Sequence, residues 1–410
     1  MRAQKARPFS DDSLLALVRE HGTPLFVYDA ATIRTRCAEL RVRFDVVRYA
    51  QKANSNLAVL ALVRAAGCVV DAASAGEVER AFTAGFRAEE IVFTADLFDR
   101  PALDCLVRRR VRVNLGSADM LEQFAALGIA REVTLRVNPG FGSGHTNAVT
   151  TGGPHSKHGI WHAELEEALE RARAAGLTVT GLHVHVGSGA GLAGLLAAAR
   201  AMRALAPRVG RSLSILSAGG GLQVPYRPGE ERVDLEPLAE VWRTVQRELE
   251  REFDRPLALE IEPGRYLVAE SGVLLAEVRA TKRSDEFAFA LVDAGFHNLP
   301  RPRLYGAYHE ITVLGRADGA PLVPQVVAGP LCEAADVFTQ DEHGRLEPRA
   351  LPRLAPGDLL CIHDAGAYAA SMASNYNSQP FATEVLVDGP AVRVIRRRQE
   401  LANLWRDERG

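Results

Sequence analysis

The sequence predicts an α/β plus β architecture: a TIM-like (β/α)8 barrel with a second, mostly β domain. Two patterns predict this fold. Strand-like runs rich in β-branched residues alternate with stretches of amphipathic helical spacing, and eight such units fit within about 220 residues. A closed barrel explains eight alternating units better than an open doubly wound sheet, which usually has fewer strands. Beyond about residue 271, strand-like runs follow one another without regular helices.

The barrel elements are predicted one by one from their periodicity. The strands are predicted at 46–50, 68–72, 91–95, 111–115, 133–137, 181–186, 213–217 and 257–261. The clearest helices between them are predicted at 57–66, 76–84, 121–126, 164–175 and 235–252.

The β domain is predicted from later strand-like runs and one early run. The later runs are 273–279, 287–292, 311–313, 325–328, 359–362 and 391–396. A run at 24–28 precedes the barrel and is a candidate to join the same sheet. We therefore predict a barrel domain at 30–268 and a discontinuous β-rich domain made of 1–29 and 269–410.

Composition narrows the class of partner. The chain has 410 residues, of which 47% are hydrophobic and 24% charged, as in ordinary soluble globular proteins. Its 49 basic and 51 acidic residues give a net charge of −2, which provides no general attraction for nucleic acid or an anionic membrane. A small molecule is the expected partner.

The cysteines and the N-terminus indicate the compartment. Five cysteines are widely spaced without a C-x-x-C pair, so neither a disulfide framework nor a metal site is predicted. The N-terminal residues include no apolar signal-peptide core, and we find no candidate membrane span. We expect a cytoplasmic protein.

Unusual residues follow four of the predicted barrel strands, where such barrels place their chemistry. Lys52 follows the first strand and His185 ends the sixth. A glycine triplet, 219–221, follows the seventh, and Glu262 follows the eighth. The long connection 138–160 exceeds an ordinary barrel loop and is a candidate to close over this site.

The glycine triplet is a candidate phosphate site. Gly219, Gly220 and Gly221 would let backbone N–H groups approach an anion, and a helix starting after them would add a favourable dipole. Three glycines alone are more often a tight turn. Barrels frequently bind phosphate after strands seven and eight, however, and Gly264 and Arg265 follow the eighth.

The sixth strand alternates apolar residues with His183 and His185, which places both imidazoles on the inner face of the barrel. A core role is the better interpretation for His183. The His185 ring is a candidate to stack on a planar ligand, while Ser188 is a candidate to meet a phosphate. Metal binding by the pair is disfavoured because spacing supplies no third ligand.

A lysine able to form an imine, a phosphate cradle and a carboxylate in one barrel mouth together indicate pyridoxal 5′-phosphate (PLP). Glu262 is the candidate partner of the pyridine nitrogen, which it would keep protonated. Asp71, at the end of the second strand, is a candidate to hold Lys52. Helix capping by Asp71 or Ser74 is an equally good interpretation.

Several motifs in the same order resemble the fold-type III PLP-dependent decarboxylases, specifically the diaminopimelate decarboxylase family in its gammaproteobacterial-type version. The resemblance spans nearly the whole chain. It is carried by YAQKAN, HVGSG, SAGGGL, EIEPGRYLVAESG, RPRLYGAYH, VAGPLCEAADVF, HDAGAYAASMASNYNS and the segment from NPGFGSGHTN to TGGPHSKHGIW.

This resemblance implies conversion of meso-2,6-diaminopimelate to L-lysine and carbon dioxide, and it assigns roles across the chain. Lys52, His185, Ser188, the glycine triplet and Glu262 would hold PLP as described above. The resemblance also assigns the distal end of the substrate to Arg265, Arg301 and Tyr305, proton donation to Cys332, a substrate amine to Glu333, and the phosphate or substrate to Tyr368. In this family Cys332 and Glu333 would reach the site across a head-to-tail homodimer.

One departure weakens the substrate assignment. The family usually reads Cys-Glu-Ser-Gly-Asp, whereas this chain has Ala334 at the serine position, so a hydroxyl expected near the substrate is missing. A related amino acid such as D-lysine or D-ornithine, or a specialised-metabolism intermediate, is the alternative substrate. Amino-acid racemisation and a non-catalytic PLP-binding role are two competing interpretations of the same motifs.

Overall fold

The computed structural model describes residues 7–144, 150–316 and 319–408. The chain divides into two compact units. We call Arg34–Val224 with Arg232–Tyr266 the barrel unit, and Met1–Ile33 with Pro225–Glu231 and Leu267–Gly410 the β-rich unit. The domain boundaries predicted from the sequence stay a prediction.

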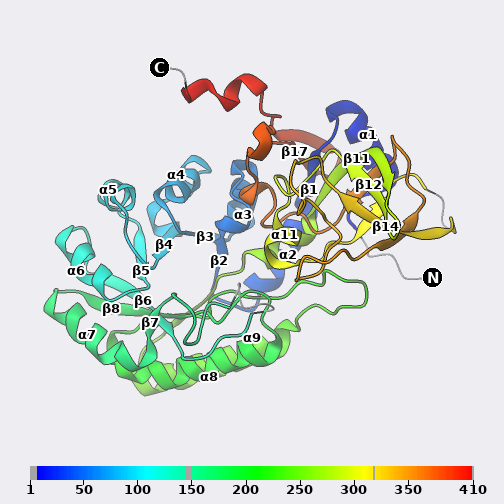
Figure 1. Ribbon diagram of the computed structural model, residues 1–410. Coiled ribbons are helices and arrows are strands. Elements are labelled where there is room, and N and C mark those ends of the chain that lie inside the picture. Colours follow the sequence, from blue (N-terminus) through cyan, green and yellow to red (C-terminus); the bar gives the residue numbers. More distant parts are fainter. Residues whose placement is uncertain (1–6, 145–149, 317–318, 409–410) are drawn as a thin grey trace. The chain divides into compact units, whose positions relative to one another are not determined.

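Within the described residues, eight parallel strands close into a barrel, as predicted (Figure 1). Closure is made by β5 with β6 on one side and by β10 with β2 on the other. The barrel strands are β2 (Val46–Ala50), β3 (Val69–Ala72), β4 (Ile91–Ala95), β5 (Arg112–Leu115), β6 (Glu132–Asn138), β8 (Thr178–Val184), β9 (Ile215–Ser217) and β10 (Ala258–Ile261). A two-residue strand, β7 (Ile160–Trp161), pairs with β6.

Helices surround the barrel strands, and their ends follow local sequence signals. The Ser74 side chain caps α4 by accepting from the Glu77 N–H at 3.2 Å, and Asp99 caps α5 in the same way. The helices that follow the barrel strands are α3 (Leu57–Ala65), α4 (Ala75–Thr83), α5 (Arg100–Arg109), α6 (Asp119–Ala126), α7 (Leu165–Ala174), α8 (Leu192–Val209) and α9 (Leu235–Phe253).

The longest of these helices, α9, shows why the layer is stable. Leu238, Trp242, Val245 and Leu249 recur at three- and four-residue intervals and are buried. α8 and α9 lie side by side on the outside of the barrel (Figure 1). Leu235, Ala239 and Phe253 are buried as well, and the exposed positions of α9 are polar.

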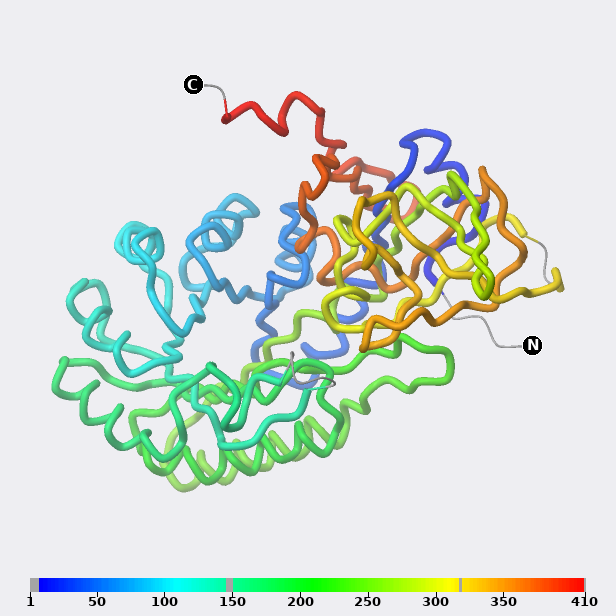
Figure 2. Tube along the Cα trace, in the orientation of Figure 1, coloured from blue at the N-terminus to red at the C-terminus, as the bar shows by residue number. Residues whose placement is uncertain are grey.

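The β-rich unit is built on one sheet in which distant segments pair. β1 lies between the antiparallel β11 and the parallel β17, so the N-terminal part of the chain is incorporated among C-terminal strands (Figure 2). The strands are β1 (Leu25–Asp29), β11 (Gly272–Arg283), β12 (Ala288–Val292), β13 (Ile311–Val313), β14 (Leu322–Ala328), β15 (Arg349–Pro352), β16 (Leu359–Ile362), β17 (Thr383–Asp388) and β18 (Ala391–Arg396). The sequence analysis missed β15 and β17.

The core of the β-rich unit joins this sheet to an N-terminal helix, α1 (Asp11–His21). Leu14 and Leu17 of α1 are buried against apolar side chains of β1 and β11. The described residues contain three further α-helices: α2 (Ala30–Arg41), α10 (Arg265–Val268) and α11 (Arg301–Tyr305).

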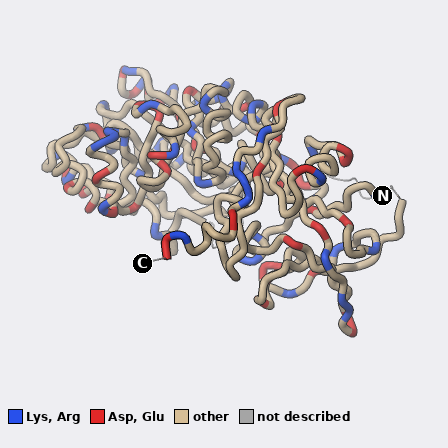
Figure 3. Tube along the Cα trace, turned by 90° about the horizontal axis from the view of Figure 1, so that it is seen from above, with Lys and Arg blue, Asp and Glu red and all other residues tan. Residues whose placement is uncertain are grey.

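Charged residues of both signs are interleaved along both units (Figure 3). This pattern agrees with the net charge of −2. Among the residues that the structure describes, none of the helices is both long and apolar enough to cross a bilayer.

Candidate active site

Lys52 lies just past the end of β2, in a single 3-10 turn, Gln51–Ala53. Its side chain is exposed, while the neighbouring Gln51 is buried and donates to the Glu77 carbonyl at 3.0 Å. The Lys52 ammonium is one of the charges that lower the pKa values of Asp71 and His185. Lys52 therefore lies within electrostatic reach of residues on two other barrel strands.

Asp71 ends β3 as a buried carboxylate. Burial raises the pKa of Asp71 to about 6, and the Glu262 charge adds to this effect, while a hydrogen bond to Thr94 and the Lys52 charge oppose it. The capping role in the next helix belongs to Ser74. Of the two capping candidates, Ser74 is the one that caps α4, and the role of Asp71 toward Lys52 stays a prediction.

Glu262 follows β10 and is anchored by the neighbouring strand. Its Oε1 accepts a hydrogen bond from the Ser217 hydroxyl at 2.6 Å. Burial raises the pKa of Glu262, although the hydrogen bond from Ser217 and the charge of Arg48 oppose the shift. The second carboxylate oxygen, Oε2, lies 3.3 Å from His183 Nε2.

His183 occupies the barrel interior, as predicted. The Asn114 amide nitrogen lies 2.7 Å from His183 Nδ1, so Nδ1 accepts and the proton belongs on Nε2, toward Glu262. Burial, reinforced by the Arg136 charge, lowers the pKa of His183 well below its ordinary value. His183 is therefore a neutral residue whose Nε2 faces the Glu262 carboxylate.

His185 lies one step beyond the end of β8 and is also neutral. Its Nδ1 accepts from the Gly220 backbone N–H at 3.2 Å. Its ring is nearly parallel to that of His183, with 6.4 Å between centroids and 12° between planes. Burial and the Arg136 and Lys52 charges lower the pKa of His185 well below its ordinary value. A neutral, fixed imidazole plane suits stacking against an aromatic ring.

The glycine triplet is needed for close approach between strand ends. A Cβ on Gly219 would meet the Val184 carbonyl at 2.4 Å, and Gly219 has a φ of +63°. A Cβ on Gly220 would meet the Glu262 carbonyl at 2.2 Å. These contacts exclude larger residues. The expected helix directly after the triplet is wrong, because α9 begins only at Leu235, so this turn gains no helix dipole from it.

Arg265 joins the eighth strand end to the sixth. It begins α10 directly after Gly264 and is only 7% exposed. Its Nη2 donates to the Ser188 hydroxyl at 2.8 Å. The two candidate anion-binding side chains in the barrel unit are therefore adjacent.

The remaining candidates belong to the β-rich unit. Arg301 and Tyr305 are the first and last residues of α11. Cys332 and Glu333 are exposed on the loop after β14, and Tyr368 has a φ of +56°. The structure brings Lys52, Asp71, His185 and Glu262 into one barrel mouth, and it places these five residues in the other unit.

The backbone of the Cys332 loop is held by the buried carboxylate of Asp336. Asp336 accepts from the backbone N–H groups of Leu331 at 2.9 Å and Phe296 at 2.7 Å. The Cys332 N–H donates to Asn377 Oδ1 at 2.7 Å. Ala334, the departure from the family pattern, is exposed on this loop.

Sequence reasoning missed the residues that support the site. Ser217, Asn114 and Arg136 lie on barrel strands and are buried. Each occupies a position that alternates with apolar residues in its strand, which was the available signal for an inward-facing polar side chain. A strand-by-strand search for such residues would have found all three.

The long connection 138–160 is tied to the barrel at its far end. Gly159 donates its N–H to Asp96 Oδ1 at 3.0 Å, and the ring of His158 contacts the same carboxylate. Residues 145–149 lie outside the described residues. Closure of this connection over the site stays a prediction.

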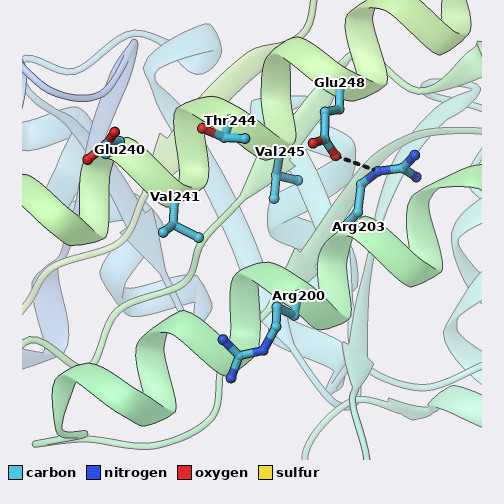
Figure 4. Close-up of a pocket in the computed structure, with 7 residues that line it drawn as sticks. All are labelled: Arg200, Arg203, Glu240, Val241, Thr244, Val245 and Glu248. Atoms are coloured by element: carbon cyan, nitrogen blue, oxygen red, sulfur yellow. Dashed lines mark hydrogen bonds and ion pairs between the residues drawn. The ribbon is translucent and has the colours of Figure 1, made fainter.

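A surface groove lies away from these strand ends, between α8 and α9 on the outer layer of the barrel (Figure 4). It has a volume of about 350 Å³, and among its lining residues Arg203 Nε lies 2.9 Å from Glu248 Oε2. Val241 and Val245 line it from α9. Its lining contains neither a lysine nor a cysteine, so we do not assign the chemistry to it.

Comparison with known proteins agrees with the site. Residues 30–269 match the family model of the pyridoxal-dependent decarboxylases, pyridoxal binding domain. Diaminopimelate decarboxylase of Streptomyces coelicolor is 52% identical over 96% of this chain and 91% of its own length. The Escherichia coli K12 protein of that name is 49% identical over 96% of this chain and 95% of its own. The chain belongs to the diaminopimelate decarboxylase family.

Solved structures of this family have the same fold. A crystal structure of diaminopimelate decarboxylase superposes with a TM-score of 0.94 at 48% identity, covering 98% of both chains. The Helicobacter pylori diaminopimelate decarboxylase, complexed with L-lysine, has a TM-score of 0.86 at 32% identity and covers 96% of this chain and 99% of its own. The chain is accordingly a PLP-dependent carboxy-lyase of fold type III.

The barrel mouth of this family member fits PLP. Asp71 Oδ1 is buried and has no hydrogen-bond partner among the described residues, which is costly unless a further polar or charged group satisfies it. His185 supplies a neutral ring plane, Glu262 a buried carboxylate, and Lys52 an amine within their electrostatic reach. Arg265 and Ser188 supply donors for a phosphate.

Proposed function

We propose that this enzyme decarboxylates meso-2,6-diaminopimelate to L-lysine and carbon dioxide. The observation that carries the proposal is identity of 49% and 52%, over nearly the full length, with two enzymes named diaminopimelate decarboxylase. A feature of this chain supports it: Arg301 is a 2% exposed guanidinium, well suited to a carboxylate at the far end of the substrate. A simple diamine precursor such as ornithine would lack that carboxylate.

We assign the cofactor contacts residue by residue. Lys52 would carry PLP covalently, Glu262 would face the ring nitrogen, and His185 would cover the ring face. Asp71 would hold the Lys52 amine. Ser188, Gly219, Gly220, Gly221, Gly264, Arg265 and Tyr368 would surround the phosphate. When bound, PLP withdraws the electron pair left on Cα as carbon dioxide departs.

The protein's own contribution is to fix charges and protons around that step. Glu262, held by Ser217, would face the ring nitrogen of PLP and would keep that nitrogen protonated. Neutral His183 and His185 add no positive charge beside it. After carbon dioxide leaves, Cα needs a proton, and Cys332 is the proposed donor, with Lys52 as the other candidate.

Substrate recognition is assigned to a second set. Arg301, Tyr305 and Arg265 would bind the distal end of diaminopimelate, Glu333 would bind an amine, and Tyr368 is a further candidate contact. Ala334 provides no hydroxyl, and loss of one hydrogen bond to a substrate costs roughly 1 to 3 kcal/mol of affinity. That loss shifts preference among diamino acids without abolishing the chemistry.

We further propose a homodimer in which each site takes Cys332 and Glu333 from the partner subunit. The exposure of both side chains supports this arrangement, because a proton donor for a water-protected reaction has to be covered by another surface. The free state of Cys37, Cys68, Cys105, Cys332 and Cys361 suits a reducing cytoplasm, which we propose as the compartment.

The reaction is tested by a decarboxylation panel. The purified holoenzyme is incubated with meso-2,6-diaminopimelate, D-lysine, D-ornithine and the L forms of lysine and ornithine, and carbon dioxide and products are measured. We expect carbon dioxide and L-lysine from meso-diaminopimelate. A higher kcat/KM for D-lysine or D-ornithine than for meso-diaminopimelate would contradict the proposed substrate. Epimerisation without release of carbon dioxide would contradict decarboxylation and identify the enzyme as a racemase.

The shared site is tested by mixing two inactive variants. Lys52→Ala and Cys332→Ala subunits each lack one half of every site. If the sites are shared, random mixing in equal amounts restores about a quarter of wild-type activity, because half of the dimers then contain one complete site of two. Sedimentation gives the oligomeric state, and mixtures that stay inactive despite subunit exchange contradict the proposal.

A further inference from the structure

A segment between barrel elements belongs instead to the β-rich unit. The chain leaves the barrel unit after Val224 and re-enters it at Arg232. The intervening residues form a fixed turn: the Glu230 carboxylate accepts from the backbone N–H groups of Tyr226 at 2.8 Å and Arg227 at 3.0 Å. Tyr226 and Arg227 are therefore presented together by one hydrogen-bonded turn.

The two presented side chains contact two successive residues after α11. The Tyr226 ring meets the His309 ring edge to face, with 5.4 Å between centroids. The Arg227 guanidinium lies 4.3 Å from the centroid of the Tyr308 ring, which the Arg349 guanidinium also contacts at 4.0 Å. The turn therefore makes one edge-to-face ring contact, Tyr226 with His309, and one guanidinium–ring contact, Arg227 with Tyr308.

Tyr226 also contacts Arg301. The Arg301 guanidinium lies 4.4 Å from the centroid of the Tyr226 ring. Its Nη1 lies 2.7 Å from His309 Nε2, and His309 Nδ1 lies 2.7 Å from the His363 carbonyl oxygen. Because a carbonyl only accepts, the proton of His309 is on Nδ1, and Nε2 is left to accept from Arg301. His309 therefore holds one guanidinium nitrogen, and the Tyr226 ring covers the guanidinium.

The plane of this guanidinium matters for recognition. A guanidinium binds a carboxylate through two parallel N–H groups, so a tilt of its plane misaligns both hydrogen bonds. A buried cation over an aromatic ring gains more from that contact than an exposed one does. A ring over the guanidinium limits its tilt, which the hydrogen bond to His309 at one nitrogen does not do alone.

We propose that Tyr226 is a positioning residue that sets the specificity of the enzyme for substrates and products with a distal carboxylate, by holding the Arg301 guanidinium in its binding plane. The inference rests on the proposed function. Tyr226 follows the last glycine of the triplet, Gly221, by five residues. One short stretch of chain therefore carries both a proposed phosphate-binding turn and the residue that orders the carboxylate-binding arginine.

The test compares two ligands that differ only in the carboxylate. L-Lysine and 1,5-diaminopentane are titrated calorimetrically into the holoenzyme and into three variants. We expect Tyr226→Leu to weaken L-lysine binding about tenfold, the size of a buried cation–π contact, and diaminopentane binding less than about twofold. Tyr226→Phe keeps the ring face and should bind L-lysine within about threefold of wild type.

Tyr308→Leu is the matched control. It removes an aromatic contact to Arg227 and Arg349 from the same region without touching Arg301. We expect its L-lysine affinity to stay within about twofold of wild type. In steady-state assays Tyr226→Leu should raise KM for meso-diaminopimelate with kcat nearly unchanged, and the visible absorbance of PLP should be retained.

The outcomes separate this inference from the proposed function. A wild-type protein that releases no carbon dioxide from meso-diaminopimelate overturns the proposed function. If the wild type is active, three results overturn the inference alone: Tyr226→Leu binds L-lysine as tightly, it weakens both ligands equally, or Tyr308→Leu gives the same selective loss.

Discussion

The two units prepare their functional residues in different ways. In the barrel unit the proposed cofactor residues hold one another: Ser217 binds Glu262, and the Gly220 N–H binds His185. In the β-rich unit Cys332 and Glu333 stand exposed on a loop. The proposed cofactor residues of the barrel mouth are thus held through their side chains within one unit. In the Cys332 loop the hydrogen bonds hold the backbone, and the side chain of the proposed proton donor is exposed.

Both units bury charged residues, among them Arg301 and Asp336 in the β-rich unit, but those of the barrel interior interact with one another. The barrel interior contains Arg48 and Glu260 as a buried ion pair, with Arg48 Nη2 3.0 Å from both Glu260 oxygens. It also contains Asp71 and Glu262, whose pKa values are raised by burial. Burying such groups costs stability, so these residues oppose folding at neutral pH unless a partner compensates them. The following predictions test this difference between the barrel unit and the β-rich unit.

The largest effect is expected at Lys52. Lys52→Ala removes the amine that would bind PLP covalently, and we expect decarboxylation to fall at least about 1,000-fold with loss of the imine absorbance. Carbon dioxide release and the visible spectrum measure both. Lys282→Ala, an exposed lysine of β11, is the control and should behave as wild type. Full activity in the Lys52 variant would eliminate the proposed role.

The next effect concerns stability of the barrel. Arg48→Met leaves Glu260 as a buried charge beside the more distant Arg112, whose Nη1 lies 3.7 Å away. We expect a loss of about 3 to 5 kcal/mol in the free energy of unfolding, measured by urea denaturation. The double variant Arg48→Met/Glu260→Leu removes both charges and should recover most of this loss. Equal destabilisation of both variants would show that packing of the arginine, not its charge, matters.

The corresponding test of the β-rich unit is Cys332→Ala. We expect kcat to fall about 100-fold or more, the ordinary contribution of a positioned general acid, with abortive transamination as a side reaction. Product analysis detects that side reaction. Cys361→Ala, a buried cysteine of β16, is the control and should retain product partitioning. Unchanged partitioning in the Cys332 variant would count against proton donation by this thiol.

A smaller effect is expected from the pKa of Asp71, which is about 6 in the folded chain and 3.8 as the ordinary value. The folded state binds the Asp71 proton more tightly than the unfolded state does. The free energy of unfolding therefore falls as pH rises from about 3.8 to about 6, and above pH 6 the full destabilisation by the Asp71 charge is present. At pH 7.5 the free energy of unfolding of the cofactor-free Asp71→Asn variant should therefore be about 1 to 3 kcal/mol higher than that of the cofactor-free wild type.

The same comparison at low pH is the control for Asp71. Near pH 4 the wild-type carboxyl is mostly protonated in the folded chain, so the advantage of Asp71→Asn should nearly vanish. Urea denaturation at several pH values measures the difference. An advantage that does not change with pH would mean that the charge of Asp71 is not its source.

The smallest effect is expected at Ala334. Ala334→Ser restores the hydroxyl of the family pattern on an exposed loop, and we expect kcat/KM for meso-diaminopimelate to rise by up to about tenfold, the worth of one hydrogen bond. Ala335→Ser, the next residue, is the control. An unchanged or lower value would indicate that this chain recognises its substrate without that group.

Barrel strands were predictable because their signals are local. All eight appear within three residues of the predicted bounds, since apolar runs and their separators depend only on neighbouring residues. β15 and β17 were missed. β15 carries Pro352 and has only four residues, which weakens its local signal. β17 contains the β-branched Thr383, Val385 and Val387 and was recognisable locally, but its place beside β1 was not. Such pairing depends on segments far away in the sequence.

The candidate site divides in the same way. Lys52, His185, the glycine triplet and Glu262 were predictable because each ends a strand, and all barrel strands end at one mouth. Ser217 and Asn114 showed only the alternation of an inward-facing strand residue, which does not reveal their partners in other elements. Tyr226 showed no such signal, because it acts through Arg301 of α11. The expected helix after the triplet was wrong because the chain first runs through Pro225–Glu231, which belongs to the other unit.

The sequence by itself determined the barrel, the strand-end chemistry and the choice of PLP, since periodicity and residue type decide these locally. Only the tertiary structure decided the protonation and orientation of the groups. The neutral state of His185, the raised pKa of Asp71 and the plane of Arg301 all depend on burial and on contacts between distant elements. Electrostatic energy depends on distance in space, which separation along the chain does not give.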